Sequence, residues 1–132
     1  MKHGCVILAD VHHPLLEALE GLLGVMFETV VMVSSCESLL DAAHKMQPDL
    51  IVADLSLPSS DNQKLLLKLD KGSNIFKIII LGAYNETDIV NSIMNKGING
   101  YVLKRSAATD LFQAVEKVLA GEVYVSPLAV SE

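Results

Sequence analysis

The sequence contains few cysteines and no closely spaced pair of them. Cys5 and Cys36 are its only two, and they do not form a C-x-x-C pattern. Because disulfide frameworks and zinc sites need more cysteines at closer spacing, neither is indicated. We interpret Cys5 as a small core residue. Cys36 lies near a predicted helix start, where a redox role is the less favoured interpretation.

Long hydrophobic runs are also absent. Hydrophobic residues make up 51% of the chain and the mean hydropathy is +0.41, yet the longest clean apolar runs have only about four or five residues. Runs of this length cannot span a bilayer, so no membrane contact is expected. The start of the chain, Met1–Gly4, lacks the pattern of a secretion signal, and we therefore expect a cytoplasmic protein.

Positive charge is scarce. The chain has 10 Lys and Arg residues against 16 Asp and Glu residues, which gives a net charge of −6 and an isoelectric point near 5.1. Such a surface repels phosphate backbones. Binding of DNA by these residues alone is therefore not expected.

What the sequence does contain is a fivefold alternation of short apolar runs and amphipathic segments. This order is typical of a parallel sheet with crossover helices, and 132 residues suffice for one such domain. Predicted strands cover 5–9, 29–33, 50–53, 77–81 and 100–103, and predicted helices follow at 14–26, about 34–46, 61–70, around 89–94 and around 111–119. The expected fold is α/β, a doubly wound five-stranded parallel sheet of order 2-1-3-4-5 with five helices. Residues 1–122 form the predicted domain, and 123–132 read as an exit linker.

Several helix ends carry local signals. Capping-box spacings occur at Ser34-x-x-Glu37 and at Ser60-x-x-Gln63. Gly97 and Gly121 stand where a left-handed residue commonly closes a helix. These signals predict where the second and third helices begin and where the fourth and fifth end.

Charged residues follow three of the predicted strands. In an open doubly wound sheet, ligands sit outside the carboxyl ends of the strands, where the strand order reverses. Asp10 and Asp54 close the first and third strands, and Lys104 closes the fifth. Two carboxylates that share a crevice need a cation or a proton to offset their repulsion, and hard oxygen ligands favour Mg²⁺. An ammonium suits a phosphoryl oxygen, so the three together indicate an aspartyl-phosphate site.

A structural interpretation exists for each of these residues taken singly. An Asp after a strand is often only a turn former or a helix cap, and a Lys at a strand end is commonly a solvated surface residue. The coincidence of all three at one edge of the sheet favours the functional interpretation.

The residues around these positions resemble a known family. Ile51–Pro58 is similar to the strand, phosphoacceptor aspartate and later proline of response regulator receiver domains, and Leu8–His12 resembles their acidic metal-binding segment. Tyr101–Lys104 resembles their switch aromatic and active-site lysine. Ala120–Pro127 resembles the NarL/LuxR-type regulators in particular. The resemblance covers essentially the whole chain.

The resemblance implies a CheY-like, flavodoxin-like fold that receives a phosphoryl group at Asp54 from a sensor histidine kinase. It implies that Asp10, Asp54 and the backbone carbonyl of Ser56 hold Mg²⁺, while Lys104 holds the phosphoryl oxygen. It further implies a phosphorelay domain that is not an enzyme beyond self-catalysed phosphotransfer and dephosphorylation.

The resemblance also implies a larger protein. In NarL/LuxR-type regulators the segment that follows Ser126-Pro127 leads into a helix-turn-helix DNA-binding domain, and this chain does not encode one. The expected role is therefore regulation of transcription, by a homodimer that contacts DNA only through such a domain. Dimerisation through helices one and five, or through the fourth helix with the fifth strand and helix, remains open at this point.

Two positions depart from the family pattern. Val11 stands where a second acidic residue is usual, which predicts weaker Mg²⁺ binding. Gly82 stands where a Ser or Thr usually bonds the phosphoryl group, so coupling between phosphorylation and Tyr101 is in question.

Alternative functions follow from these departures and from the fold. One is a phosphorylation-independent receiver that acts as a dimerisation or protein-interaction module. Another is a flavin- or nucleotide-binding domain, but Asp10–Pro14 replaces the glycine-rich or hydroxyl-rich phosphate loop that this function needs. The pair His12–His13 is interpreted as local packing and helix-start chemistry rather than as a transition-metal site.

Overall fold

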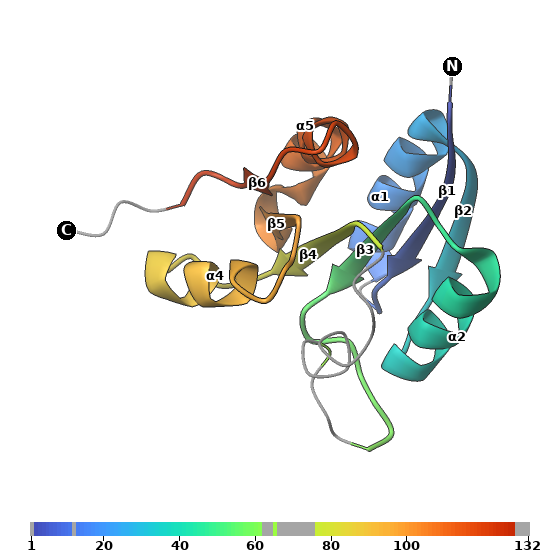
Figure 1. Ribbon diagram of the computed structural model, residues 1–132, viewed down its shortest axis with the longest axis horizontal. Helices are drawn as coiled ribbons and strands as arrows, with labels where there is room; N and C mark the ends of the chain where they lie inside the picture. The colour runs from blue at the N-terminus through green and yellow to red at the C-terminus, as the bar shows by residue number, and fades with distance from the viewer. Residues whose placement is uncertain (1, 12, 62–64, 66–75, 129–132) are drawn as a thin grey trace.

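The computed structural model, which describes residues 2–11, 13–61, 65 and 76–128, contains one six-stranded parallel sheet (Figure 1). The strand order is β2-β1-β3-β4-β5-β6. The strands are β1 His3–Ala9, β2 Phe27–Val33, β3 Leu50–Asp54, β4 Ile78–Gly82, β5 Gly100–Leu103 and β6 Tyr124–Val125. The predicted α/β class and the order of the first five strands are confirmed.

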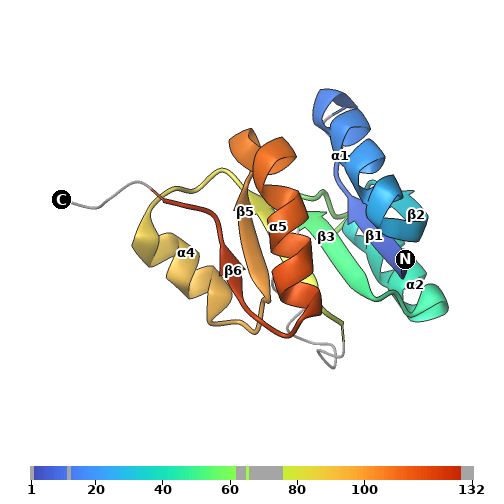
Figure 2. The same ribbon diagram turned by 90° about the horizontal axis from the view of Figure 1, so that it is seen from above.

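Helices cover both faces of the sheet. Figure 2 shows α1 and α5 on one face and α2 and α4 on the other. The helices are α1 His13–Met26, α2 Cys36–Met46, α4 Thr87–Met94 and α5 Ala107–Leu119, with a short 3-10 helix, η1, at Lys104–Ser106. Among the described residues none of these helices is long and apolar enough to cross a membrane. The predicted helix at 61–70 and the capping box that precedes it lie largely outside the described residues, so four of the five predicted α-helices are seen.

The core consists of two hydrophobic clusters, one on each face of the sheet. Strand side chains alternate between them because successive residues of a strand point to opposite faces. Leu8 and Val52 belong to the cluster under α1 and α5, whereas Ile7 and Ala53 belong to the cluster under α2 and α4. Every residue of β3, β4 and β5 is buried. Burial on both faces explains why these strands are continuous apolar runs.

The sixth strand corrects the predicted strand count of five. Tyr124 and Val125, in the predicted exit linker, pair in parallel with Gly100 and Tyr101 of β5. The backbone N–H of Tyr124 donates to the Asn99 carbonyl at 3.1 Å. The run Val123–Val125 consists of β-branched and aromatic residues, which favour strands when a free edge is available.

The start of α2 differs from the predicted capping box by one residue. Ser35, not Ser34, is the N-cap: its Oγ accepts from the Ser38 N–H, and Ser38 Oγ accepts from the Ser35 N–H, each at 3.1 Å. Glu37 instead accepts a hydrogen bond from Ser59 Oγ at 2.7 Å. The Ser38 hydroxyl thus takes the capping role that was predicted for Glu37. Glu37 instead contacts the loop after β3.

The prediction that a glycine directly closes the helix is confirmed for α5 and wrong for α4. Gly121 follows the last turn of α5 with φ of 91°, and the next N–H, of Glu122, donates to the Lys117 carbonyl at 2.9 Å, as in a Schellman motif. In contrast, the C-cap of α4 is Asn95 in a right-handed conformation, and Gly97 adopts φ of 90° two residues later. Both glycines occupy conformations that other residues rarely adopt.

Candidate functional site

Three charged residues converge at the carboxyl ends of the strands. Asp10 directly follows β1, Asp54 ends β3, and Lys104 follows β5 as the first residue of η1. Lys104 Nζ lies 3.3 Å from Asp10 Oδ1 and 2.8 Å from Asp54 Oδ2. The strand order explains the convergence, because β1 and β3 are neighbours and pair Ala9 with Ala53 immediately before the two aspartates. The predicted juxtaposition is therefore present, while the chemical roles of the residues stay predictions.

Both carboxylates are buried, and each receives a backbone hydrogen bond as well as the ammonium. Asp10 and Asp54 are each 2% exposed. The Val11 N–H donates to Asp10 Oδ1 at 2.6 Å, and the Ser56 N–H donates to Asp54 Oδ1 at 3.3 Å. Burying ions is costly unless charges and hydrogen bonds compensate them. Two carboxylates and one ammonium leave these groups with a formal charge of −1 (−2 + 1), which favours a further cation.

The donor set fits a hard divalent cation only in part. Two buried carboxylates provide the oxygen ligands that Mg²⁺ prefers, and this ion usually keeps several waters. Among the described residues, however, no group of three or more His, Cys, Asp or Glu side chains could hold a metal. Val11, 41% exposed, stands beside Asp10 and supplies no ligand. The role of the Ser56 backbone carbonyl as a metal ligand stays a prediction. The possible His12–His13 site falls outside the described side chains.

Gly82 and Tyr101 occupy neighbouring strands and share one space. The Tyr101 ring is fully buried, and its hydroxyl donates to the Tyr84 carbonyl at 2.9 Å. A Cβ added at Gly82 would overlap the Tyr101 Oη and would lie 2.7 Å from Cε1 and 2.8 Å from Cζ. Burial raises the pKa of the Tyr101 hydroxyl above its ordinary value. Tyr101 thus fills the volume that a side chain at position 82 would need.

A hydrogen-bond network behind Lys104 was not predicted from the sequence. Asp110 Oδ2, in the first turn of α5, accepts from the hydroxyls of Ser106 and Ser126, both at 2.8 Å. Ser126 Oγ also accepts from the Leu103 N–H at 3.0 Å. The strand-like run Val123–Val125 is the one sequence signal that could have brought Ser126 next to β5.

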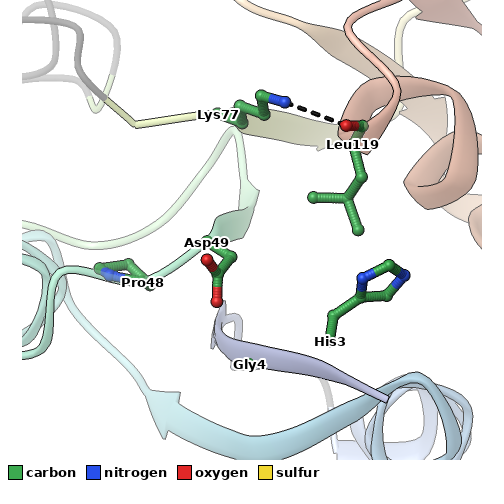
Figure 3. Close-up of a pocket in the computed structure, with 6 residues that line it drawn as sticks. All are labelled: His3, Gly4, Pro48, Asp49, Lys77 and Leu119. Atoms are coloured by element: carbon green, nitrogen blue, oxygen red, sulfur yellow. Dashed lines mark hydrogen bonds between the residues drawn. The ribbon is translucent and has the colours of Figure 1, made fainter. Parts of the chain in front are cut away.

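The opposite rim of the sheet also carries charged residues, around a pocket of about 430 Å³ (Figure 3). There Asp49 Oδ2 accepts from the Cys5 N–H at 2.8 Å, and Lys77 Nζ donates to the Leu119 carbonyl at 3.1 Å. Burial, and secondarily the charge of Asp49, raises the pKa of the Cys5 thiol. Cys36, the first residue of α2, is fully buried in the cluster between α2 and the sheet.

Comparison with known proteins gives a consistent result. The family model described as the response regulator receiver domain matches residues 6–116. The chain is 28% identical over 123 residues to the nitrate/nitrite response regulator protein NarL of Escherichia coli, which covers 92% of this chain and 57% of that protein. It is 29% identical over 100 residues to the response regulator protein VraR of Staphylococcus epidermidis, which covers 76% of this chain and 48% of that protein. The chain therefore spans about half the length of these curated relatives.

Solved structures agree in fold. The non-phosphorylated receiver domain of the stress response regulator RcsB from Escherichia coli has a TM-score of 0.85, with 24% identity over 96% of this chain and 100% of that one. A structure of RcsB from Salmonella typhimurium has a TM-score of 0.83, with 25% identity over 95% of this chain and 62% of that one.

Proposed function

Because the chain belongs to the response regulator receiver domain family and is similar to NarL-type members, we propose that its Asp54 accepts a phosphoryl group from a sensor histidine kinase. The observation that carries this proposal is the bridge formed by Lys104 between two buried carboxylates, Asp10 and Asp54. An oxygen nucleophile and a cation that can hold a phosphoryl oxygen thus stand side by side.

The residues of the site suit an in-line displacement at phosphorus. An oxygen of the Asp54 carboxylate forms the new P–O bond while the P–N bond of the phosphohistidine donor breaks, and the departing imidazole nitrogen takes up a proton. Lys104 Nζ, 2.8 Å from Asp54 Oδ2, is close enough to move onto a phosphoryl oxygen. The ammonium offsets negative charge that accumulates in the transition state. The chain itself is a phosphoacceptor and not an enzyme with an external substrate.

Magnesium is the cofactor that these residues would hold. Asp10, Asp54 and the Ser56 carbonyl would be its protein ligands, and the bound ion supplies charge neutralisation at the phosphoryl oxygens. With Val11 beside Asp10 in place of an acidic residue, we expect the binding to be weak.

The wider role follows from the relatives. We infer that the chain is the regulatory part of a longer cytoplasmic transcription regulator, whose DNA-binding domain follows Ser126-Pro127. One structure of RcsB is described as two RcsB dimers bound to two parallel DNAs, which supports the proposal of a homodimer.

The test is chemical phosphorylation of the purified chain. Incubation with acetyl phosphate or phosphoramidate and millimolar Mg²⁺ is expected to add the mass of one phosphoryl group. Asp54→Asn is expected to abolish this gain. Asp41→Asn is the matched control, because Asp41 is a solvent-exposed aspartate on α2 whose Oδ2 lies 3.1 Å from Lys45 Nζ. A wild-type chain that gains no mass, or an Asp54→Asn chain that still does, contradicts the proposal.

One observation favours a second function, that of a phosphorylation-independent interaction module. Tyr101 is already buried and bonded to Tyr84, and Gly82 offers no hydroxyl that a phosphoryl group could attract. In this reading the chain forms the same assembly whether or not Asp54 is modified.

Sedimentation of the chain before and after treatment with the phosphodonor separates the two functions. A change in oligomeric state that Asp54→Asn prevents supports regulation by phosphorylation. An assembly that is the same in both conditions and in the variant supports the interaction module.

A further inference from the structure

The long side chain of Lys104 has to place its ammonium between the carboxylates of Asp10 and Asp54. A lysine loses much rotamer freedom when its ammonium is fixed, and the position of its backbone decides where it can reach. Lys104 begins the short helix η1, which lies between the end of β5 at Leu103 and the start of α5 at Ala107. The backbone of this junction therefore sets the distance from Lys104 Nζ to the two carboxylates.

Asp110 is bonded to groups on both sides of Lys104. C-terminal to Lys104, the hydroxyl of Ser106, the last residue of η1, donates to Asp110 Oδ2 at 2.8 Å. Ser126 Oγ donates to the same oxygen at 2.8 Å. The same hydroxyl oxygen accepts from the N–H of Leu103, the residue directly before Lys104, at 3.0 Å. Ser126 is 1% exposed, so water does not compete freely for its hydroxyl.

These contacts form a continuous chain of hydrogen bonds from α5 to the residues that flank Lys104. We propose that Asp110, through the hydroxyls of Ser106 and Ser126, is a positioning residue that holds Lys104 on the phosphoacceptor. The proposal rests on the proposed function for the importance of Lys104, but the placement of the ammonium can be measured without phosphorylation.

The first readout is the NMR signal of the Lys104 ammonium in the unmodified chain, assigned by its loss in Lys104→Arg. In the wild type it is expected to be distinct from the signal of Lys45, whose side chain is 71% exposed. Asp110→Ala is expected to shift it toward the position of Lys45. Asp110→Asn is expected to preserve it, because both hydroxyls bond one oxygen and an amide oxygen can accept both.

Asp88→Ala is the matched control. Asp88 is exposed and occupies the first turn of α4 as Asp110 occupies the first turn of α5, so both carboxylates interact similarly with their helix ends. If Asp110→Ala does not fold, Ser126→Ala and Ser106→Ala each remove one hydroxyl and are expected to move the Lys104 signal in the same direction. A Lys104 signal that is unchanged in a folded variant, or that already matches Lys45 in the wild type, overturns the proposal.

The second readout is the rate of phosphorylation by saturating acetyl phosphate. Asp110→Ala is expected to slow it by about tenfold or more, since small displacements of a positioned group cost one to two orders of magnitude. Asp110→Asn is expected to recover the rate, and Asp88→Ala to leave it unchanged. If the wild type accepts no phosphoryl group, the proposed function fails, and the NMR result still decides whether Asp110 positions Lys104.

Discussion

The two rims of the sheet carry the same kinds of charged residue and use them in different ways. At the carboxyl rim, Lys104 reaches the carboxylates of Asp10 and Asp54, so charges face one another. At the amino rim, Asp49 accepts from the Cys5 backbone and Lys77 donates to the Leu119 backbone. The charges at the amino rim satisfy single backbone groups, whereas those at the carboxyl rim form a cluster with a net charge. Only the second arrangement has the carboxylates and the ammonium that the proposed phosphoryl transfer needs.

Removal of the lysine should have the largest effect, and it should differ between the rims. Lys104→Met leaves two buried carboxylates without their shared ammonium, and we expect the unfolding free energy to fall by about 3 kcal/mol. Lys77→Met loses one hydrogen bond to the Leu119 carbonyl, and we expect a fall of about 1 kcal/mol. Urea denaturation at neutral pH measures both. Equal losses in the two variants would mean that the cluster at the carboxyl rim is no more strongly coupled than an ordinary backbone contact.

Glycine replacements sharpen the comparison. A methyl group at Gly82 meets the buried Tyr101 ring, and overpacking of this kind costs about 2 kcal/mol. A methyl group at Gly4 meets Asp49 Oδ2, and the Asp49 side chain can turn away from it. This movement breaks the hydrogen bond from the Cys5 N–H, which costs about 1 kcal/mol of unfolding free energy. We therefore expect Gly82→Ala to be the more destabilising in thermal or urea unfolding. NMR signals of Tyr101 should move in Gly82→Ala and stay in place in Gly4→Ala; the reverse pattern would contradict the assignment of shared space.

The weak metal affinity expected at the carboxyl rim can be reversed by one added charge. Val11→Asp is expected to tighten Mg²⁺ binding by about tenfold, which corresponds to about 1.4 kcal/mol. Val25→Asp is the control, since Val25 is 70% exposed in the last part of α1 and adds the same charge elsewhere. Calorimetric titration with MgCl₂ measures both variants. If the two variants bind Mg²⁺ equally well, the charge beside Asp10 does not limit the affinity.

The smallest effect is expected at alkaline pH. Burial raises the pKa values of Tyr101 and Tyr124 above the ordinary value of 10.0, and the charge of Asp110 adds to the shift of Tyr124. Above pH 10 these two tyrosines bind fewer protons in the unfolded chain than in the folded chain. Their contribution to stability is therefore constant below this pH and falls as pH rises toward the folded pKa values. Tyr101→Phe should make this fall shallower in urea denaturation at a series of pH values. A slope that is unchanged in Tyr101→Phe would contradict the raised pKa of Tyr101.

Most of the fold could be predicted because the signals are local and repeated. Apolar runs mark the strands that are buried on both faces, and the residues just after them mark one rim of the sheet. Asp10, Asp54 and Lys104 could therefore be brought together from strand order alone. The resemblance to receiver domains identified Gly82 as a departure from the family pattern and Tyr101 as the switch aromatic, although it did not reveal that the two residues occupy one volume.

Errors arose where two local signals compete or where a partner is distant. Ser34 and Ser35 are both acceptable N-caps, and the choice of Ser35 became visible only with Glu37 bonded to Ser59 in the loop after β3. Tyr124–Val125 read as part of a linker because two residues are too short a run for a strand prediction.

The sequence by itself determined the alternation of strands and helices, the order of the sheet and the identity of the charged residues at its carboxyl rim. The tertiary structure alone decided the inward position of Tyr101, the sixth strand and the bonds that connect Asp110 with Ser106 and Ser126. The reason is physical: periodicity and strand ends depend on neighbours along the chain, whereas a side chain's volume and hydrogen-bond partners depend on residues that only folding brings near.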